Sequence, residues 1–430
     1  MTEDFLHFSW KFLMFRQDDI YTTSGEKVII SKPGIHNHDA GPDFFDARIS
    51  LDGVQWAGNV EIHINSSDWR KHNHHLDETY NSVVLHVVYQ HDEEVYNTHG
   101  KRIPVLELKD KLPGLFYKNY KSLVAVFTPV SCREYISEIS PAVIRSQFDK
   151  ALVSRLERKT KPVIQLLEKF KYDWEEVAFV LFARALGQKT NAQAFEQLAL
   201  SVSHKLIKKN AGNLQIIEAI LFGQAGFLNT KFSDPYFRLL KKEYAFQKKK
   251  NISFPLTGGE WKFSKMRPSN FPTIRIAQLA AVMHRSPDIF YELCETPSAA
   301  SFFEKFHVPA SEYWNTHFRF GESVGNHKKF LGEQALNGIL INAAIPLIFC
   351  YGHLRDEEKY RQKALDWLAE LKPEFNRYTR LWQSLGLENN NAFDSQAMIE
   401  QFDHWCEKKK CLSCSIGTCL IRSKEYEFSP

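Results

Sequence analysis

The chain has 430 residues, of which 43% are hydrophobic and 25% charged. This apolar content excludes disorder as the main state, because it offers enough surface to offset the entropy lost on folding. At about 100–200 residues per domain, the length predicts two or three domains. No apolar run approaches the about 18–20 residues that span a bilayer, and the acidic start Thr2-Glu3-Asp4 is unlike a secretory signal. We therefore expect no membrane contact.

The small net charge of +4 hides an asymmetry. Residues 1–110 carry 10 basic and 18 acidic side chains, and 10 of the 17 histidines lie in the first 100 residues. The remainder is basic, so the two parts suit a divalent cation and a polyanion respectively. Seven cysteines in a chain this long do not form a disulfide scaffold, which predicts a reducing, cytoplasmic environment.

The first predicted elements are a helix over 4–15 and a group of short strands. Phenylalanines at spacings of three and four predict the helix. Strands are expected at 27–30, 44–51, 54–64 and 83–89, with a loop and a short helix over 66–80. Asp52-Gly53 predicts a tight hairpin between the second and third of these strands.

From about residue 113 the periodicity is helical almost to the end. Helices are expected at 163–170, 174–185, 192–206, 214–222, 274–284, 332–349 and 356–371. We therefore predict an α+β protein with a small N-terminal mixed α/β domain over 1–112. A large helical domain follows over 113–403, and a cysteine-rich tail occupies 404–430.

Carboxylates and imidazoles crowd three short segments, 36–43, 58–63 and 68–77. Glu61 and His63 are two residues apart on a predicted strand, so they point to one face. The hairpin brings Asp43 toward Glu61, and converging carboxylates suit Mg²⁺ or Mn²⁺, whereas imidazoles shift the preference toward Mn²⁺ or Zn²⁺. The alternative is that these groups cap turns and bond locally. His86, inside an apolar run, is expected to be a core histidine.

The strand register decides whether Asp43 reaches Glu61. A two-residue turn pairs Leu51 with Val54, which places Asp43 opposite Ile62 and Asp46 opposite Asn59. One extra residue must be inserted for Asp43 to join Glu61, so we predict a bulge near Gly58 or a longer loop. With a regular ladder, Asp46 would take the place of Asp43.

Pro42-Asp43 on one strand followed by Glu61-Ile62-His63 on the next resembles the core of the PD-(D/E)xK nuclease superfamily, over roughly residues 1–100. The resemblance implies a restriction-endonuclease-like fold in which the acidic pair holds Mg²⁺ or Mn²⁺. This chain has His63 where the family has lysine, and very-short-patch repair endonucleases are a branch with histidines at the site. His63 is therefore expected to act as a general base or a metal ligand. The expected neighbours of the site are His38, Asp39, Asp68, His72 and His74.

The whole chain also resembles a bacterial family of uncharacterised proteins. The matching landmarks lie at 36–44, 58–63, 67–69 and 267–272. This family brings no established activity.

The tail carries four cysteines spaced C-x4-C-x2-C-x4-C, namely Cys406, Cys411, Cys414 and Cys419. Four thiolates could hold Zn²⁺ or a [4Fe–4S] cluster, and helicase-associated nucleases of the same superfamily carry an iron–sulfur staple. Alternatively the tail holds no metal and its cysteines are packing residues. Cys132, Cys294 and Cys350 are isolated and are expected to be buried packing residues.

Basic side chains interleave with aromatic ones between residues 241 and 275. This mixture is typical of nucleic-acid binding, since cations neutralise phosphates while aromatic rings stack on bases, although a solvated surface has the same composition. The candidate nucleic-acid contacts are Lys248, Lys249, Lys250, Lys265, Arg267 and Arg275.

Together these patterns predict a metal-dependent phosphodiesterase acting on DNA or RNA. Asp43 and Glu61 would hold the metal, and His63 would activate water. Two alternatives stay open: a non-catalytic scaffold with a degenerate nuclease fold that binds nucleic acid or the ribosome, and a metal-dependent hydrolase of a small substrate. No phosphate-binding glycine loop or G-x-S-x-G elbow is present, which argues against a P-loop NTPase or a serine hydrolase.

Overall fold

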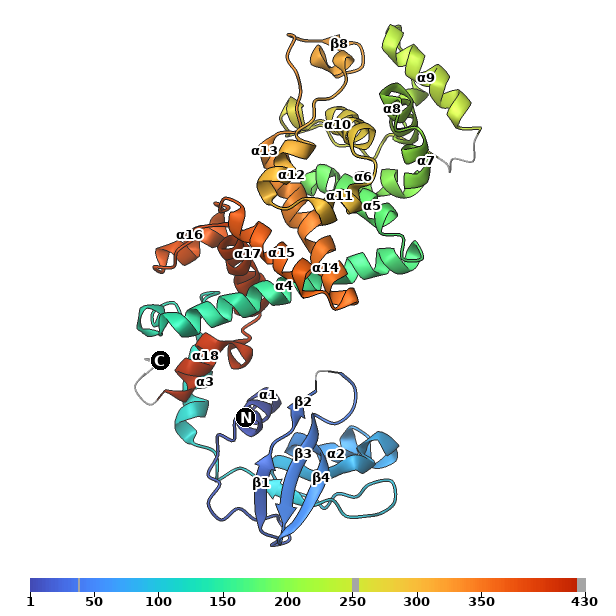
Figure 1. Ribbon diagram of the computed structural model, residues 1–430. Coiled ribbons are helices and arrows are strands. Elements are labelled where there is room, and N and C mark those ends of the chain that lie inside the picture. The colour runs from blue at the N-terminus through green and yellow to red at the C-terminus, as the bar shows by residue number, and fades with distance from the viewer. Residues whose placement is uncertain (38, 250–254, 424–430) are drawn as a thin grey trace. The chain divides into compact units, whose positions relative to one another are not determined.

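The computed structural model describes residues 1–37, 39–249 and 255–423, and it divides into two compact units. Unit 1 combines residues 1–147 with those from 401 on, and unit 2 comprises residues 148–400. The architecture is α+β, as predicted, with a small sheet in unit 1 and a mostly helical unit 2 (Figure 1). The division differs from the expected boundaries at 112 and 403, because residues 113–147 and the tail belong with the sheet.

The sheet of unit 1 has the strand order β1-β3-β4-β5-β6, and β2 also pairs with β3. Its strands are β1 (Val28–Lys32), β2 (Ile35–His36), β3 (Phe44–Leu51), β4 (Val54–Asn65), β5 (Val83–Gln90) and β6 (Val105–Glu107). β3 and β4 form the predicted antiparallel hairpin, with Asp52 and Gly53 at φ 45° and 84° in its turn. β4 pairs in parallel with β5, so β4 lies inside the sheet.

The predicted bulge is present, on the strand opposite to Gly58. From Leu51↔Val54 to Ala47↔Gly58 the register is regular, and it then shifts so that Phe44 faces Val60. The extra residue lies in β3, where Asp46 has a φ of 54°. Aspartate tolerates this left-handed conformation better than most residues.

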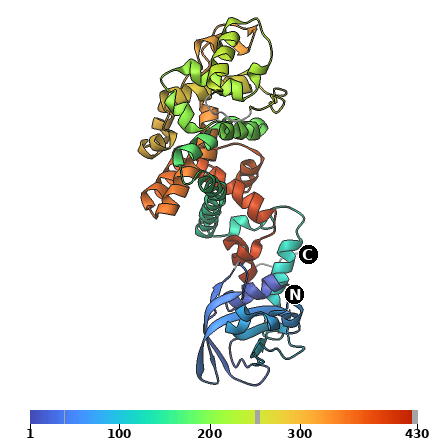
Figure 2. The same ribbon diagram turned by 90° about the vertical axis from the view of Figure 1, so that its right-hand side faces the viewer.

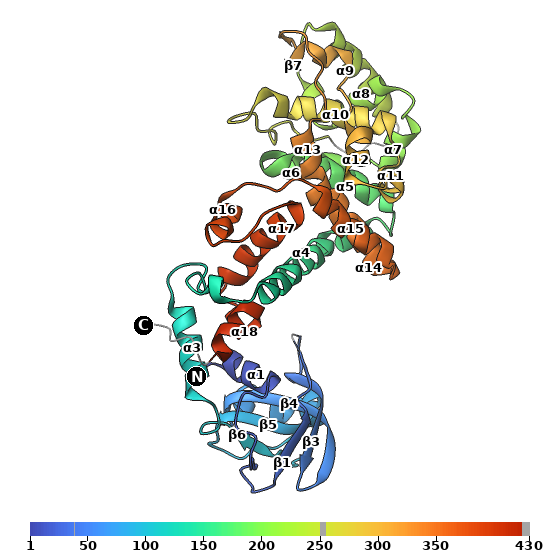
Figure 3. The same cartoon turned by 60° about the vertical axis from the view of Figure 1, so that its left-hand side comes forward.

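Helices cover both faces of the sheet. Leu6 and Trp10 of α1 (Glu3–Lys11) join the core formed by Val60 and Ile62 on one face. The β4–β5 crossover contains α2 (Asp68–Lys71), and its Trp69 packs on the other face. Figures 2 and 3 show α1 against the strands. The helix expected over 4–15 ends early, because the chain turns back at Leu13, whose φ is 49°.

Two further helices complete unit 1, and they come from distant parts of the sequence. α3 (Gly114–Ala125) packs against α18 (Ser415–Arg422). The Asn119 side chain donates a hydrogen bond to the carbonyl of Ile421 at 3.3 Å. The tail is therefore an integral part of unit 1.

Unit 2 is built mainly from helices. They are α4 (Pro141–Lys169, which begins in unit 1), α5 (Trp174–Leu186), α6 (Gln188–Ser201), α7 (His204–Lys209), α8 (Leu214–Gln224), α9 (Pro235–Gln247), α10 (Pro272–Arg285), α11 (Ile289–Glu295), α12 (Ala299–Phe306), α13 (Glu333–Ile339), α14 (Ile345–Arg355), α15 (Glu358–Glu370), α16 (Arg377–Ser384) and α17 (Ala392–Glu400). A short hairpin consists of β7 (His317–Arg319) and β8 (Glu322–Ser323).

Two features of unit 2 correct the sequence analysis. The single helix expected over 192–206 is interrupted, because Val202 is extended and the Ser203 side chain caps the start of α7. The continuous helical segment 333–355 is long and apolar enough to cross a membrane, contrary to the expectation that no run approaches that length. Its most apolar window is 78% buried, as in the core helices of globular proteins.

Candidate metal centre

The bulge in β3 places Asp43 directly beside Glu61. The backbone N–H of Asp43 donates to Oε2 of Glu61 at 3.1 Å, and the N–H of Ile62 donates to Oδ2 of Asp43 at 2.9 Å. Asp46 lies elsewhere, in an exposed ion pair with Lys32. The prediction that Asp43, and not Asp46, joins Glu61 is therefore confirmed.

Glu61 is a buried carboxylate inside the sheet. Its exposed fraction is 4%, and that of His63, on the same face of β4, is 1%. Burial, reinforced by the negative charge of Asp43, raises the pKa of Glu61 far above its ordinary value. No lysine or arginine is paired with this carboxylate among the ion pairs of the described residues; the partners of Glu61 are histidines.

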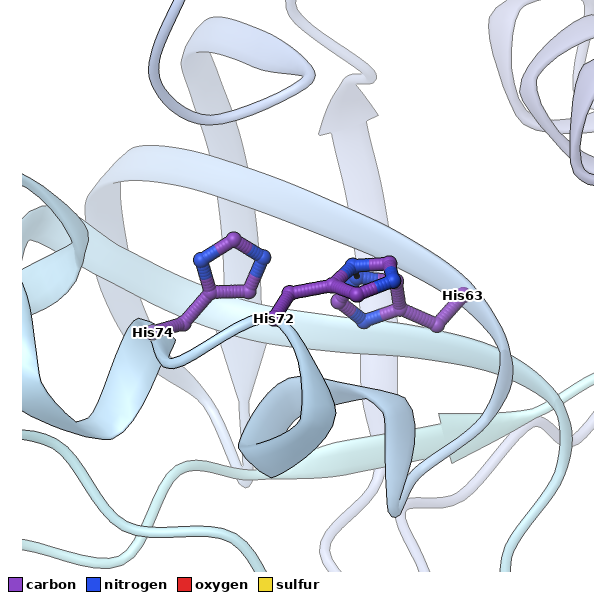
Figure 4. Close-up of side chains that lie close together, drawn as sticks. All are labelled: His63, His72 and His74. Atoms are coloured by element: carbon purple, nitrogen blue, oxygen red, sulfur yellow. Dashed lines mark hydrogen bonds between the residues drawn. The ribbon is translucent and has the colours of Figure 1, made fainter.

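Three histidines gather around Glu61. His63 comes from β4, His72 ends α2, and His74 follows Asn73, whose left-handed backbone reverses the chain. Figure 4 shows the rings of His63, His72 and His74 grouped together, and one ring nitrogen of each lies within 4.8 Å of the others. The prediction that His72 and His74 neighbour His63 is therefore confirmed.

The shortest contacts in this group link its members in pairs. Nε2 of His63 lies 3.0 Å from Nδ1 of His72 and 3.5 Å from Oε1 of Glu61. Nε2 of His74 lies 3.3 Å from the same oxygen of Glu61 but makes no hydrogen bond, although it is buried. Four ligands bound tetrahedrally at 2.0–2.1 Å are about 3.3–3.4 Å apart. The three histidines therefore lie close enough to hold one ion, and Glu61 lies beside two of them, His63 and His74.

Two of the three histidines, His63 and His74, are held neutral, which is the form that binds metals. Burial is the main cause that lowers the pKa of His63 and of His74. Behind them, Nδ1 of His63 lies 2.9 Å from Nε2 of the fully buried His86, whose pKa burial lowers to about 3. His86 is a core histidine, as expected, and it also fixes the ring of His63 so that Nε2 faces Glu61.

Sequence reasoning missed His7, because α1 brings it to the site from far along the chain. Its Nε2 lies 3.3 Å from Oδ2 of Asp43. Burial opposes protonation of His7, but the adjacent Asp43 carboxylate outweighs burial and raises its pKa. The position of His7 on the polar side of a helix rich in phenylalanine was the available signal.

The remaining expected neighbours do not join the cluster. Asp68 accepts hydrogen bonds from the Asn65 N–H and the Lys71 side chain, so it organises the start of α2. Asp39 is exposed in a turn where its N–H bonds to Asn37. His38 lies outside the described residues. The contacts of Asp39 and Asp68 therefore fit the alternative that these residues cap turns and bond locally.

Three of the four tail cysteines share one cavity in unit 1, and the fourth does not. Cys406, Cys411 and Cys414 line it, together with Cys132. Cys419 lies on α18 and is absent from the lining. The expectation that Cys132 is isolated is therefore wrong, because folding brings it beside the tail.

The basic candidates lie in unit 2. Lys248, Lys249, Lys265 and Arg267 are exposed, and Lys250 lies outside the described residues. Arg275 is 6% exposed and donates hydrogen bonds to Gln278 and Asn270. This corrects the expectation that Arg275 binds nucleic acid, because its guanidinium is hydrogen-bonded inside the fold.

Unit 2 also gathers Glu175, His204 and Asp288 closely enough for a metal. Glu175 accepts the N–H groups of Phe290 and Tyr291, and Asp288 pairs with a lysine. These contacts explain the group as the cap of α11 and its surroundings.

Comparison with curated proteins and with solved structures found no match to this chain. The resemblance of residues 1–100 to PD-(D/E)xK nucleases is therefore not confirmed and stays a hypothesis. A family profile described as "Protein of unknown function (DUF2851)" matches residues 3–377. Because this match covers most of the sequence, including the histidine cluster, the chain belongs to the DUF2851 family.

Proposed function

We propose that this protein is a metal-dependent phosphodiesterase acting on nucleic acid, with one divalent ion held by His63, His72 and His74 next to Glu61. The convergence of the three imidazoles beside a buried carboxylate carries the proposal. Glu61 is buried without a lysine or arginine partner among the described ion pairs, and the imidazoles of its partners His63 and His74 are neutral. A cation at this point would compensate the carboxylate. The nitrogen-rich set favours Zn²⁺ or Mn²⁺ over Mg²⁺.

The site residues divide into ligands and a proton acceptor. His63 is buried, and both its ring nitrogens have partners, so it suits a ligand better than a general base. Asp43 is partly exposed and is held by the Ile62 N–H beside Glu61. We assign Asp43 the role of accepting a proton from the attacking water. A bound metal ion would supply an acidified water and stabilise charge on the phosphate.

An open site favours a polymer over a small substrate. His72 is exposed, so the cluster meets solvent directly. A phosphodiester on an extended strand can approach such a surface, whereas small-molecule sites enclose most of the ligand. The exposed Lys248, Lys249, Lys265 and Arg267 remain candidates for phosphate contacts. None of the seven cysteines forms a disulfide, in keeping with the cytoplasmic location that we infer.

The direct test is cleavage of labelled DNA and RNA by the metal-stripped protein reloaded with Mn²⁺, Zn²⁺ or Mg²⁺. We expect Mn²⁺ or Zn²⁺ to restore cleavage. Glu61→Gln should reduce it by more than the about 10–100-fold that loss of an outer-shell partner costs. Asp46→Asn is the matched control, because Asp46 lies on the same sheet but pairs with Lys32 away from the cluster. Equal activity of Glu61→Gln and wild type would refute the proposal.

A non-catalytic scaffold is the second candidate, since Glu61 as a fourth protein ligand would fill a tetrahedral ion as closed structural sites do. It predicts that the metal binds and that Glu61→Gln abolishes this binding, but that no substrate is cleaved. Salt-sensitive binding of nucleic acid without turnover would then favour the scaffold.

A further inference from the structure

A second, unrelated group of metal-binding side chains lies in unit 1. The four cysteines of the cavity come from two parts of the chain more than 270 residues apart: Cys132 follows α3, and the other three belong to the tail. The remaining lining includes Leu123, Pro129, Trp405 and Gly417, so the surroundings are mainly apolar. Buried, mostly apolar surroundings with four thiols are typical of a structural metal or cluster site.

Polar contacts fix the two chain segments around the cavity. Nζ of Lys409 donates to the carbonyls of Val126 and Thr128 at 2.7 Å each and to Oγ of Ser131 at 2.8 Å. Nε2 of Gln401 lies 3.5 Å from Sγ of Cys406 and 3.6 Å from Sγ of Cys414. Lys409 therefore holds the tail to the segment before Cys132, and Gln401 contacts two of the tail sulfurs.

Close backbone packing brings Cys411 into the group. A Cβ added at Gly417 would lie 2.3 Å from the carbonyl oxygen of Cys411, so only glycine allows α18 to approach this closely. This requirement explains a glycine inside a helix, where it costs about 1 kcal/mol relative to alanine.

None of the seven cysteines forms a disulfide, so the four that line the cavity are thiols that can bind a metal as thiolates.

The spacing of the sulfurs distinguishes a cluster from a single ion. Around one zinc ion, with Zn–S bonds of about 2.3 Å, tetrahedral sulfurs lie about 3.8 Å apart and leave no space between them. Among the described residues, no three cysteine sulfurs lie within 4.8 Å of one another. The sulfurs are therefore spread more widely than around a single zinc ion.

We propose that Cys132, Cys406, Cys411 and Cys414 bind a [4Fe–4S] cluster, which ties the tail to the segment that follows α3. Cys419 takes no part. The cluster lies in a different place from the Glu61 site, so this assignment does not depend on the proposed hydrolysis.

The test is the metal and sulfide content of the full chain purified without oxygen. We expect about four iron and four acid-labile sulfide per chain, with visible absorbance that a reductant bleaches. Cys132→Ser should lose most of the iron, and the matched control Cys419→Ser should keep it. A chain with one zinc and no iron would overturn the cluster assignment, as would a chain with no metal.

Iron retained by Cys132→Ser but lost by Cys419→Ser would refute the ligand set and favour the four tail cysteines alone. If Cys132→Ser is insoluble, the wild-type iron and sulfide content together with the Cys419→Ser variant still decide the proposal. Loss of iron from Cys419→Ser in that case would count against it.

Discussion

Two buried glutamates, one in each unit, show how differently this chain treats a carboxylate in its interior. Glu400 in unit 2 is 1% exposed and is paired with two arginines: Arg158 donates to both of its oxygens, at 2.6 and 3.1 Å, and Arg155 lies at 3.3 Å. Glu61 in unit 1 is about as buried but faces neutral imidazoles. Unit 2 therefore compensates its carboxylate with its own cations, whereas the Glu61 site is short of positive charge, which a metal ion would supply.

The largest effect should come from breaking the compensated pair. Glu400→Gln leaves two arginines near each other without their carboxylate, and loss of one partner of a buried pair costs about 3–5 kcal/mol. Hydrogen exchange within unit 2 measures this cost. In metal-free protein, Glu61→Gln should leave the stability of unit 1 unchanged or increase it. Equal destabilisation by Glu400→Gln and Glu61→Gln would contradict the difference proposed between the two glutamates.

A third buried glutamate extends the comparison to pH. Glu218 accepts hydrogen bonds from the hydroxyls of Tyr236 and Ser311, and burial raises its pKa from 4.5 to about 7. Because the folded-state pKa is raised, its stabilisation is full below about pH 4.5 and is lost as the pH rises through 7. The change is about 3 kcal/mol at most, on the order of 1.4 kcal/mol per pKa unit.

Chemical denaturation of unit 2 between pH 4.5 and 8 measures the effect of Glu218. Glu218→Gln should flatten the dependence across this window. A wild-type stability that rises over the same window would contradict the prediction. Glu400→Gln should not flatten it, since that variant removes a different carboxylate.

Metal should stabilise only the unit with the uncompensated glutamate. At 100 times its Kd, Zn²⁺ or Mn²⁺ should stabilise unit 1 by about 2.7 kcal/mol, and Glu61→Gln should remove this gain. Unit 2 serves as the internal control, because Glu175 there already accepts two backbone N–H groups. Protection from hydrogen exchange that rises in unit 2 to the same extent would show non-specific binding.

The smallest effect concerns the residue behind the ligands. His86→Leu removes the contact to Nδ1 of His63 without changing a ligand, and it should weaken metal binding about 10–100-fold. Titration calorimetry with the metal measures this change. His99→Ala is the control, since His99 is exposed and outside the cluster. Unchanged affinity in His86→Leu would show that His63 needs no outer support.

The sequence predicted the strands of the site well, because local patterns determine them. Alternation in residues 44–64 and the Asp52-Gly53 turn indicated the hairpin, and the pairing arithmetic required a bulge. The position of the bulge was harder to predict from the sequence, because Asp46 and not Gly58 takes the left-handed backbone conformation. Gly58 serves another purpose. A Cβ at Gly58 would lie 2.4 Å from Val84, so that glycine permits close strand packing.

The contributions that sequence reasoning missed all come from distant parts of the chain. His7 of α1 contacts Asp43, and Cys132 lies beside the tail cysteines although all of unit 2 separates them in the sequence. No local periodicity encodes such contacts. The spacing of the four tail cysteines even favoured a self-contained set, which the position of Cys419 does not support.

The division of unit 1 between the two parts of the chain has a consequence for biosynthesis. The sheet and α3 leave the ribosome first, but the residues from 401 on emerge only after all of unit 2. Domains generally fold as units during translation, beginning from the N-terminus. We therefore expect α3 to stay uncovered by α18 until unit 2 has been translated. The hydrogen bond from Asn119 to Ile421 is then among the last native contacts of unit 1 to form.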